Sequence, residues 1–106
     1  MENENLTEVN FAQHLNTKFS VPVNGRVFEL ELAEVKSYLS GPEEQQGMER
    51  FSIYFYGPPD AILPQNVYSM DHAEMGAFNI FIVPIARVEK GIRYEAVFNY
   101  YKSPMQ

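Results

Sequence analysis

The chain has 106 residues, of which 45% are hydrophobic, with eight Phe, seven Tyr and no Cys or Trp, and its net charge is −6. The absence of Cys excludes a disulfide framework, a zinc site with Cys ligands and thiol chemistry. Residues 1–49 hold nine acidic and three basic groups, whereas residues 50–106 hold five of each. An acidic chain without a stripe of Lys and Arg is not expected to bind nucleic acid.

The N-terminal sequence, Met-Glu-Asn-Glu-Asn, is polar and acidic. A secretory signal peptide begins with basic and then apolar residues, so none is expected here. No apolar run approaches the roughly 20 residues that a membrane-spanning helix needs. We therefore expect a cytoplasmic protein that does not act at a membrane.

The first expected element is a helix over residues 7–16. Asn10 followed by Gln13 resembles a capping box at the start of a helix. Phe11 and Leu15 are four residues apart and would share one helix face. Because so short a helix is not stable alone, it is expected to pack against the rest of the domain.

Two strands are expected next, on either side of a tight turn. Residues 19–23 alternate between apolar side chains and polar residues or Pro, and the following Asn24-Gly25 is typical of a two-residue hairpin turn. Residues 27–38 alternate between apolar and acidic or polar side chains, as a half-buried strand does. A bulge is expected near Glu34.

Four further strands are expected at residues 50–56, 67–72, 77–87 and 92–101. The polar and acidic residues 40–49 form the connection before the first of these. Residues 57–66 contain three prolines, which stiffen a connection that is long for a compact domain. A hairpin turn that ends at Gly91 joins the last two strands.

The expected strand at residues 77–87 is apolar on both faces. Phe78, Ile80 and Ile82 lie on one face, and Phe81, Val83 and Ile85 lie on the other. Such a strand is typically covered on both sides, and we expect the N-terminal helix to cover the second face. Because Pro84 has no N–H for a ladder, a bulge or a change of pairing is expected there.

Together these elements predict one domain over residues 1–106. It consists of a flexible tail (residues 1–6), a helix (residues 7–16) and a β body (residues 19–101). Six strands with short connections predict a mainly β fold with one short N-terminal helix. The expected arrangement is a six-stranded antiparallel meander that closes as a small barrel or a sandwich and so covers its edges.

The second half of the chain contains a series of spaced residues: Phe51-Ser52, Phe55, Gly57-Pro58, Leu63-Pro64-Gln65, Tyr68, His72, Gly76, Phe78, Phe81, Val83-Pro84, Arg87, Gly91 and Tyr94-Glu-Ala-Val-Phe98-Asn99. This series resembles a family of small bacterial domains of unknown function, over about residues 11–99. The resemblance implies no catalytic residues and no cofactor. It implies an accessory part in a phage-tail-like assembly.

His72 is the residue best suited to chemistry, because Asp71 and Glu74 are near it in sequence. A metal site needs at least three converging ligands, and neighbouring strand residues point to opposite faces. The only other His is His14. We therefore expect no metal and interpret His72 as a strand-end residue that is hydrogen-bonded to the following turn.

Other patterns for catalysis are weak. The serines lie outside any nucleophile-elbow motif, and no Gly-rich loop is present for phosphate. Glu29 and Glu31 could form a carboxylate pair, but their alternation is better interpreted as the solvent face of a strand. We therefore expect a protein that is not an enzyme, with no catalytic residue and no cofactor.

Two surface features are open to interpretation. Tyr54 and Tyr56 either form a recognition surface beside the proline-rich connection or cover the second face of the sheet. Arg87, Arg93 and Glu95 are expected to be cross-strand partners in the last hairpin.

The sequence thus favours a non-catalytic protein-interaction or structural module whose partner is a protein; it does not indicate an oligomeric state. The candidate binding surface comprises Tyr56, Pro58, Pro59, Gln65, Tyr68 and His72. One alternative is a small-ligand-binding β-barrel with its mouth near Tyr56, Gln65, Tyr68 and His72. A third is an enzyme centred on His72.

Overall fold

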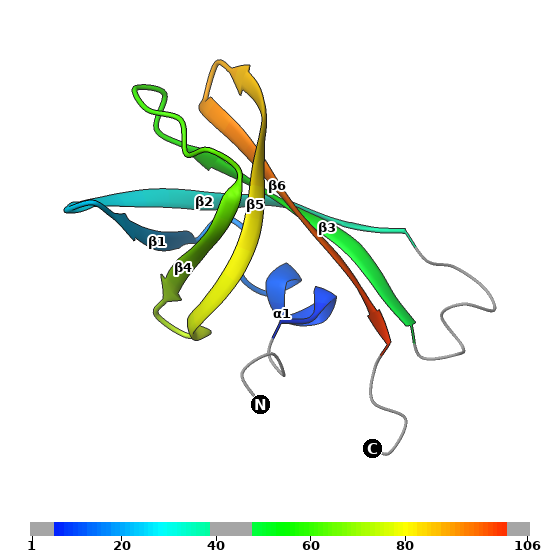
Figure 1. Cartoon of the computed structure of the whole chain (residues 1–106). Coiled ribbons are helices and arrows are strands. Elements are labelled where there is room, and N and C mark those ends of the chain that lie inside the picture. Colours follow the sequence, from blue (N-terminus) through cyan, green and yellow to red (C-terminus); the bar gives the residue numbers. More distant parts are fainter. Residues whose placement is uncertain (1–5, 39–47, 102–106) are drawn as a thin grey trace.

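A computed structural model describes residues 6–38 and 48–101 of the chain. The described part contains one short helix, α1 (Glu8–Ala12), and six strands: β1 (Lys18–Val23), β2 (Arg26–Ser37), β3 (Met48–Gly57), β4 (Asn66–His72), β5 (Gly76–Val88) and β6 (Gly91–Tyr101). Residues 1–5 of the predicted tail (residues 1–6) lie outside the described residues, whereas Leu6 is buried in the core, so the tail prediction is wrong for Leu6. Residues 40–47 of the predicted connection (residues 40–49) also lie outside them, whereas Met48 and Glu49 begin β3. The strands are antiparallel and form one sheet that closes in a ring (Figure 1), so the mainly β prediction is confirmed.

The local features of the strands follow from the sequence. Asn24 and Gly25 both adopt positive φ angles, 52° and 82°, which a two-residue hairpin turn requires. The pairing of β2 with β3 shifts register between Leu32 and Glu34, at the predicted bulge. The pairing of β5 with β6 shifts between Pro84 and Ala86, as the missing N–H of the proline predicts.

The strand order around the ring is β1-β2-β3-β6-β5-β4. This order departs from a plain meander, because β3 pairs with β6 and not with β4, the next strand in the chain, and β4 pairs with β1. Residues 58–65 therefore cross one end of the ring, which we call the loop end. The opposite end, where α1 lies, we call the helix end (Figure 1).

The loop end is closed by the proline-rich connection. Leu63 is buried, and its backbone N–H donates a hydrogen bond of 2.8 Å to the Tyr94 hydroxyl inside the ring. Gly91 has a φ of 137°, and a Cβ at this position would collide with the carbonyl oxygen of Gly57. Glycine is therefore required where the connection leaves β3 beside the start of β6.

The helix end is closed by Phe11 of α1. Its fully buried ring lies within 5.5–6.3 Å of the rings of four other phenylalanines, Phe19, Phe51, Phe78 and Phe98. These four come from β1, β3, β5 and β6, so one helix residue contacts strands from all around the ring. The expectation that the helix packs against the sheet is confirmed.

The helix is shorter than the predicted span, and its predicted N-cap is wrong. Thr7, not Asn10, is the N-cap, because the Thr7 hydroxyl accepts a 3.1 Å hydrogen bond from the Asn10 backbone N–H. Residues 13–16 form turns, and Asn16 adopts a φ of 69° that ends helical geometry. Leu15 lies in these turns and is partly exposed, so only Phe11 provides the apolar face.

The interior of the ring is filled by side chains that alternate along each strand. The buried hydrophobic residues of the strands are Phe19, Val21, Phe28, Leu30, Leu32, Phe51, Ile53, Phe55, Met70, Phe78, Ile80, Ile82, Ile92, Tyr94 and Ala96. Glu29 is exposed and Glu31 partly exposed on the outside of β2, as the alternation predicts. The ring is thus a packed core.

The prediction that α1 covers the second face of β5 is wrong. α1 packs on β2 and β3 at the helix end, and Phe81 on the outer face of β5 is 49% exposed. The reason is geometric, because a five-residue helix fits into the end of the ring and is too short to cover its side. The outer face of β5 has no cover from the described part of the chain.

Candidate functional site

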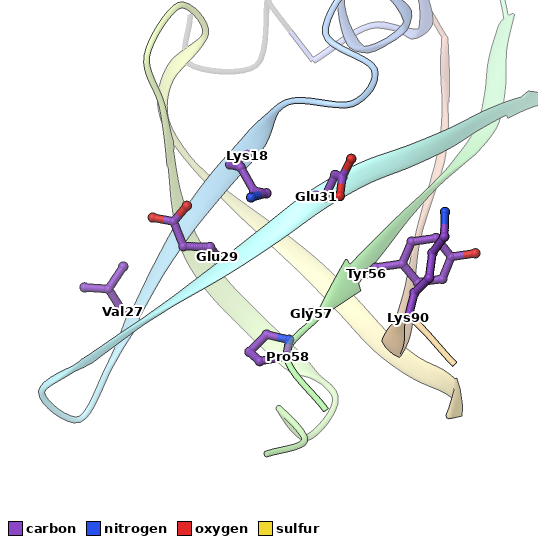
Figure 2. A pocket seen from close by; sticks show the side chains of 8 residues that line it. All are labelled: Lys18, Val27, Glu29, Glu31, Tyr56, Gly57, Pro58 and Lys90. Atoms are coloured by element: carbon purple, nitrogen blue, oxygen red, sulfur yellow. The ribbon is translucent and has the colours of Figure 1, made fainter. Parts of the chain in front are cut away.

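A groove lies on the outer face of β1 and β2, beside the start of the proline-rich connection. Its volume is about 560 Å³. It is lined by Lys18, Val27, Glu29, Glu31, Tyr56, Gly57, Pro58 and Lys90, whose side chains are shown in Figure 2. Two residues of the predicted binding surface, Tyr56 and Pro58, thus lie in one concavity. The interior of the ring is filled by side chains, so this groove is a surface feature and not the opening of a hollow barrel.

The groove combines an aromatic ring with charges of both signs. The Lys90 ammonium lies 5.4 Å from the centre of the Tyr56 ring, and Arg93 donates a 3.0 Å hydrogen bond to the Tyr56 hydroxyl. Glu29 and Glu31 contribute carboxylates from β2 (Figure 2). This lining offers stacking, a hydrogen-bonded phenol and two carboxylates.

Three other predicted residues lie at the loop end but outside the groove lining. Gln65 is exposed. The Pro59 carbonyl accepts a 3.0 Å hydrogen bond from Arg87, and the Tyr68 hydroxyl donates to the Pro64 carbonyl. Burial raises the pKa of Tyr68. These contacts hold the connection against β4 and β5, which is a structural role.

His72 does not lie with the other predicted residues. It is the last residue of β4, so it lies at the helix end, whereas Gln65 immediately precedes the same strand at the loop end. Its Nδ1 accepts hydrogen bonds from the backbone N–H groups of Glu74 (3.0 Å) and Met75 (3.1 Å). The interpretation of His72 as a strand-end residue bound to the following turn is confirmed.

The surroundings of His72 favour its neutral form. Burial lowers its pKa below the ordinary value, and the nearby His14, whose ring centre is 4.7 Å away, lowers it further. Its second nitrogen, Nε2, lies 2.9 Å from the Thr17 hydroxyl oxygen. Both ring nitrogens are thus engaged within the fold. Among the described residues, no group of three or more His, Asp or Glu side chains could hold a metal ion.

The sequence reading missed a hydrogen-bond network on the outer face of β3 and β6. Ser52 is fully buried there, and its hydroxyl donates a 2.7 Å hydrogen bond to Glu95 and accepts one of 3.0 Å from Tyr38. The Tyr54 hydroxyl donates to the same Glu95 oxygen at 3.2 Å. Hydrogen bonding with Tyr38, burial and Glu95 raise the pKa of Tyr54 to about 12. The network explains why Tyr54 is half-buried.

The predicted partnership of Arg87, Arg93 and Glu95 is wrong. Arg93 pairs with Glu34 of β2 at 2.9 Å, and its guanidinium lies 4.3 Å from the centre of the Tyr54 ring. The last hairpin pairs Val88 with Gly91, so in the same register Arg93 faces Ala86. The sequence gives one sign of the contact of Arg93 with Glu34 and Tyr54. The alternation along neighbouring strands places all three side chains on the outer face.

An exposed apolar surface lies on the other side of the ring, across β4, β5 and β6. We call it the apolar face, and it comprises Val67, Phe81, Val83 and Val97. Val67 pairs directly with Phe81, and Val83 pairs with Glu95, which is two residues before Val97 on the same side of β6. Val67 is 56%, Phe81 49% and Val97 64% exposed. None of the four belongs to the predicted binding surface.

Comparisons with known proteins give one match. A family model described as a domain of unknown function (DUF6916) matches residues 6–98. Neither a curated protein nor a solved structure matches the chain. Within the described residues, no helix has the length and apolar character needed to cross a membrane.

Proposed function

The chain belongs to the DUF6916 family of domains of unknown function, and we propose that it is a non-catalytic protein-interaction module that docks through its apolar face. The observation that carries the proposal is the exposure of Val67, Phe81 and Val97 on three adjacent strands. Exposed apolar side chains with a polar rim are typical of a protein interface. The rim here includes Ser69, which donates a 3.0 Å hydrogen bond to Asn79 across the strands.

The closed sheet determines how a partner can bind. Every strand has a neighbour on both sides, but β1 and β4 are joined at one residue pair, and β5 and β6 pair only from Val83 and Glu95 to their hairpin turn. Because the interior of the ring is filled, a partner that contacts side chains of the strands does so on the outside of the sheet. The apolar face offers such side chains on a rigid support, which reduces the entropy lost on binding.

The arrangement also favours a structural role in a larger assembly. Both ends of the ring are closed, by Phe11 at one end and by the connection that carries Leu63 at the other. The outer surface is then what remains for contacts. The resemblance noted from the sequence supports a phage-tail-like assembly as the setting of these contacts.

A capture experiment tests the proposal. The wild-type domain is immobilised, incubated with a lysate of its host and analysed by quantitative mass spectrometry beside Val97→Glu. A matched control is Val9→Glu, because Val9 on α1 is 63% exposed, nearly the same as Val97. We expect a stoichiometric protein that the wild type and Val9→Glu capture and that Val97→Glu loses, because binding would bury an unpaired carboxylate.

Two outcomes would contradict the proposal. If all three baits retain the same proteins, the apolar face does not bind a partner. A fourth bait carries both Tyr56→Ala and Gln65→Ala. If a partner is lost only in this double variant, recognition occurs at the loop end and not at the apolar face. Far-ultraviolet circular dichroism of each bait confirms that it is folded.

A second candidate function is the binding of a small molecule in the groove. Its volume of about 560 Å³ lies within the range of small-molecule sites, and Tyr56 and Pro58 line it. A thermal-shift screen of small molecules with both charge signs tests this candidate. A compound that stabilises the wild type but not Tyr56→Ala supports it, and a screen without any such compound counts against it.

A further inference from the structure

We propose that the partner presents an extended peptide strand, which adds to the open edges of β5 and β6 beside the apolar face. The inference rests on the proposed function, because it names the kind of partner that the same face takes. Three observations support it: the direction of the backbone groups on these edges, the lack of charge along them, and the apolar side chains beside them.

β5 and β6 are paired along only part of their lengths. Their ladder runs from Val83 and Glu95 to the hairpin turn. In the described part of the chain, residues 76–82 of β5 pair with β4 alone, and residues 96–101 of β6 pair with β3 alone. Figure 1 shows the two strands diverging toward the helix end, and we call this unpaired region the split.

The backbone of β6 points hydrogen-bonding groups into the split. In an antiparallel ladder, the N–H and C=O groups of successive residues point alternately to one neighbouring strand and to the other. The Tyr38 N–H, directly after β2, donates a 3.0 Å hydrogen bond to the Arg50 carbonyl, so the next residue of β3 points its groups at β6, where it pairs with Phe98. The groups of Phe98 therefore face β3, and those of Val97 and Asn99 face the split.

The backbone of β5 does the same from the other side. The Val67 N–H donates to the Asn66 Oδ1 at 2.8 Å, so Val67 and Phe81 form a pair without ladder hydrogen bonds. The groups of Phe81 therefore point away from β4 and toward the split. Pro84 indicates the same phase. It pairs with Tyr94 but has no N–H, so the residues of β5 that face β6 are those at odd distances from it, such as Phe81.

Neither edge of the split carries the features that normally prevent strand addition. Open edges are commonly protected by charged side chains or by prolines. Residues 76–82 and 96–101 contain neither. Glu95, where the split begins, accepts hydrogen bonds from Ser52 and Tyr54 on the side of β3. The split is therefore an uncharged acceptor for an added strand.

The other short ladder of the ring is protected. Within the described residues, β1 and β4 pair at Ser20 and Asp71 only. Toward the loop end from this pair, β1 carries Pro22, which has no N–H, and the Val67 N–H of β4 is already bonded to Asn66. This contrast is why we place the added strand at the split.

The side chains around the split favour an uncharged, partly apolar strand. Alternate side chains of an added strand point outward and inward. The outward ones would lie between Phe81, which is 49% exposed, and Val97, which is 64% exposed. The inward ones would cover Phe98, which is only partly buried. Apolar residues at alternate positions, without charges between them, therefore give the best fit.

The size of the apolar face also favours a peptide. Four partly exposed side chains form a patch on the order of a few hundred Å². A standard interface between folded proteins buries about 800 Å² from each partner. A strand needs less apolar area, because its main chain adds hydrogen bonds along the edge.

Selection from a displayed library of random peptides, with the immobilised wild-type domain as target, tests the inference. We expect the enriched peptides to carry apolar residues at alternate positions and no charge between them. Their dissociation constants are then measured for the wild type, Asn99→Pro and Asn99→Ala. The proline removes an N–H that faces the split and should raise the dissociation constant more than about tenfold. Asn99→Ala is the matched control, because it keeps that N–H, and should change the constant less than about threefold.

Hydrogen exchange provides a second measurement that needs no variant. In the free domain, the amides of Val97 and Asn99 should exchange faster than that of Phe98, whose N–H faces the β3 ladder. A selected peptide should slow the exchange of Val97 and Asn99. Amides of Val97 and Asn99 that are already as protected as that of Phe98 in the free domain would overturn the inference.

The outcomes separate this inference from the proposed function. A library that yields no peptide, or peptides that bind Asn99→Pro as tightly as the wild type, overturns strand addition. A dimer of the free domain that Asn99→Pro dissociates also overturns it, because the strand would then come from a second copy. If strand addition fails but Val97→Glu loses a lysate protein that Val9→Glu captures, the interaction module stands and its partner binds to side chains. If neither association is observed, both proposals fail.

Discussion

The two ring nitrogens of His72 have different partners, and these partners determine which nitrogen carries the proton. Two backbone N–H groups, from Glu74 and Met75, point at Nδ1, which must therefore be an acceptor. The proton lies on Nε2 and is donated to the Thr17 hydroxyl, which itself donates to the His14 carbonyl at 2.6 Å. A second proton, on Nδ1, would face two donors and break both hydrogen bonds.

This arrangement predicts that acid weakens the fold through His72. Burial and the neighbouring His14 lower its pKa in the folded protein, and the weaker opposing effects of Glu74 and Asp71 do not reverse this. The unfolded chain takes up the proton near pH 6.5 and the folded chain only at lower pH, so the free energy of unfolding falls as the pH drops below about 6.5. Urea unfolding at about pH 7.5 and pH 5.5 measures this loss.

His72→Asn supplies the control for the pH experiment, because the amide oxygen can still accept from the turn but cannot titrate. We expect a smaller loss of stability between the two pH values in His72→Asn than in the wild type. An equal loss in both proteins would mean that other groups cause the pH dependence.

At the level of single residues, part of the candidate site was predictable. The turn contact of His72 follows from its place at the end of a strand, before Ala73. The separation of His72 from Tyr56 was not predictable, because it depends on which end of each strand lies at which end of the ring. The network around Ser52 was also missed, since a serine that alternates outward normally faces solvent.

At the level of elements, α1 is a closure for the ring. Its five residues are too few for a stable isolated helix, and its position is fixed by the contacts of Phe11 with four aromatic rings. The sequence indicated a docked helix from Phe11, but it could not indicate where. The space left by the ends of the strands determines that position.

The closure by α1 leads to a stability prediction. Phe11→Ala removes a fully buried ring from the helix end and should lower the free energy of unfolding by about 3–5 kcal/mol. Val9→Ala, on the exposed side of the same helix, should change it by no more than about 0.5 kcal/mol. Urea denaturation of both variants measures the difference. A loss below about 1 kcal/mol for Phe11→Ala would mean that α1 is not part of the cooperative core.

β5 illustrates the limit of a pattern of alternation. The two apolar faces correctly indicated a strand, and Phe78, Ile80 and Ile82 are buried as predicted. The alternation does not reveal what lies against the second face. Among the described residues, no other part of the chain covers that face, so it is open to another molecule.

At the level of the whole molecule, the order of the strands was the main feature that the sequence left open. The hairpins form between neighbours in sequence and are signalled by Asn24-Gly25 and by Gly91. The pairing of β3 with β6 joins Phe51 with Phe98, residues far apart in the chain, and no local signal specifies it. Once this pairing is known, the course of residues 58–65 across the loop end follows.

The two long-range contacts of the ring are unequal. β3 and β6 are joined along ten residue pairs, whereas β1 and β4 are joined at one, Ser20 with Asp71. The ring therefore consists of two three-stranded halves, β1-β2-β3 and β6-β5-β4. The long β3–β6 ladder joins them on one side, and the single β1–β4 pair, which we call the seam, joins them on the other. The seam should form last in folding and open first in the native state. Brief openings there would expose the amides of β1 and β4 to hydrogen exchange while the β3–β6 ladder stays protected.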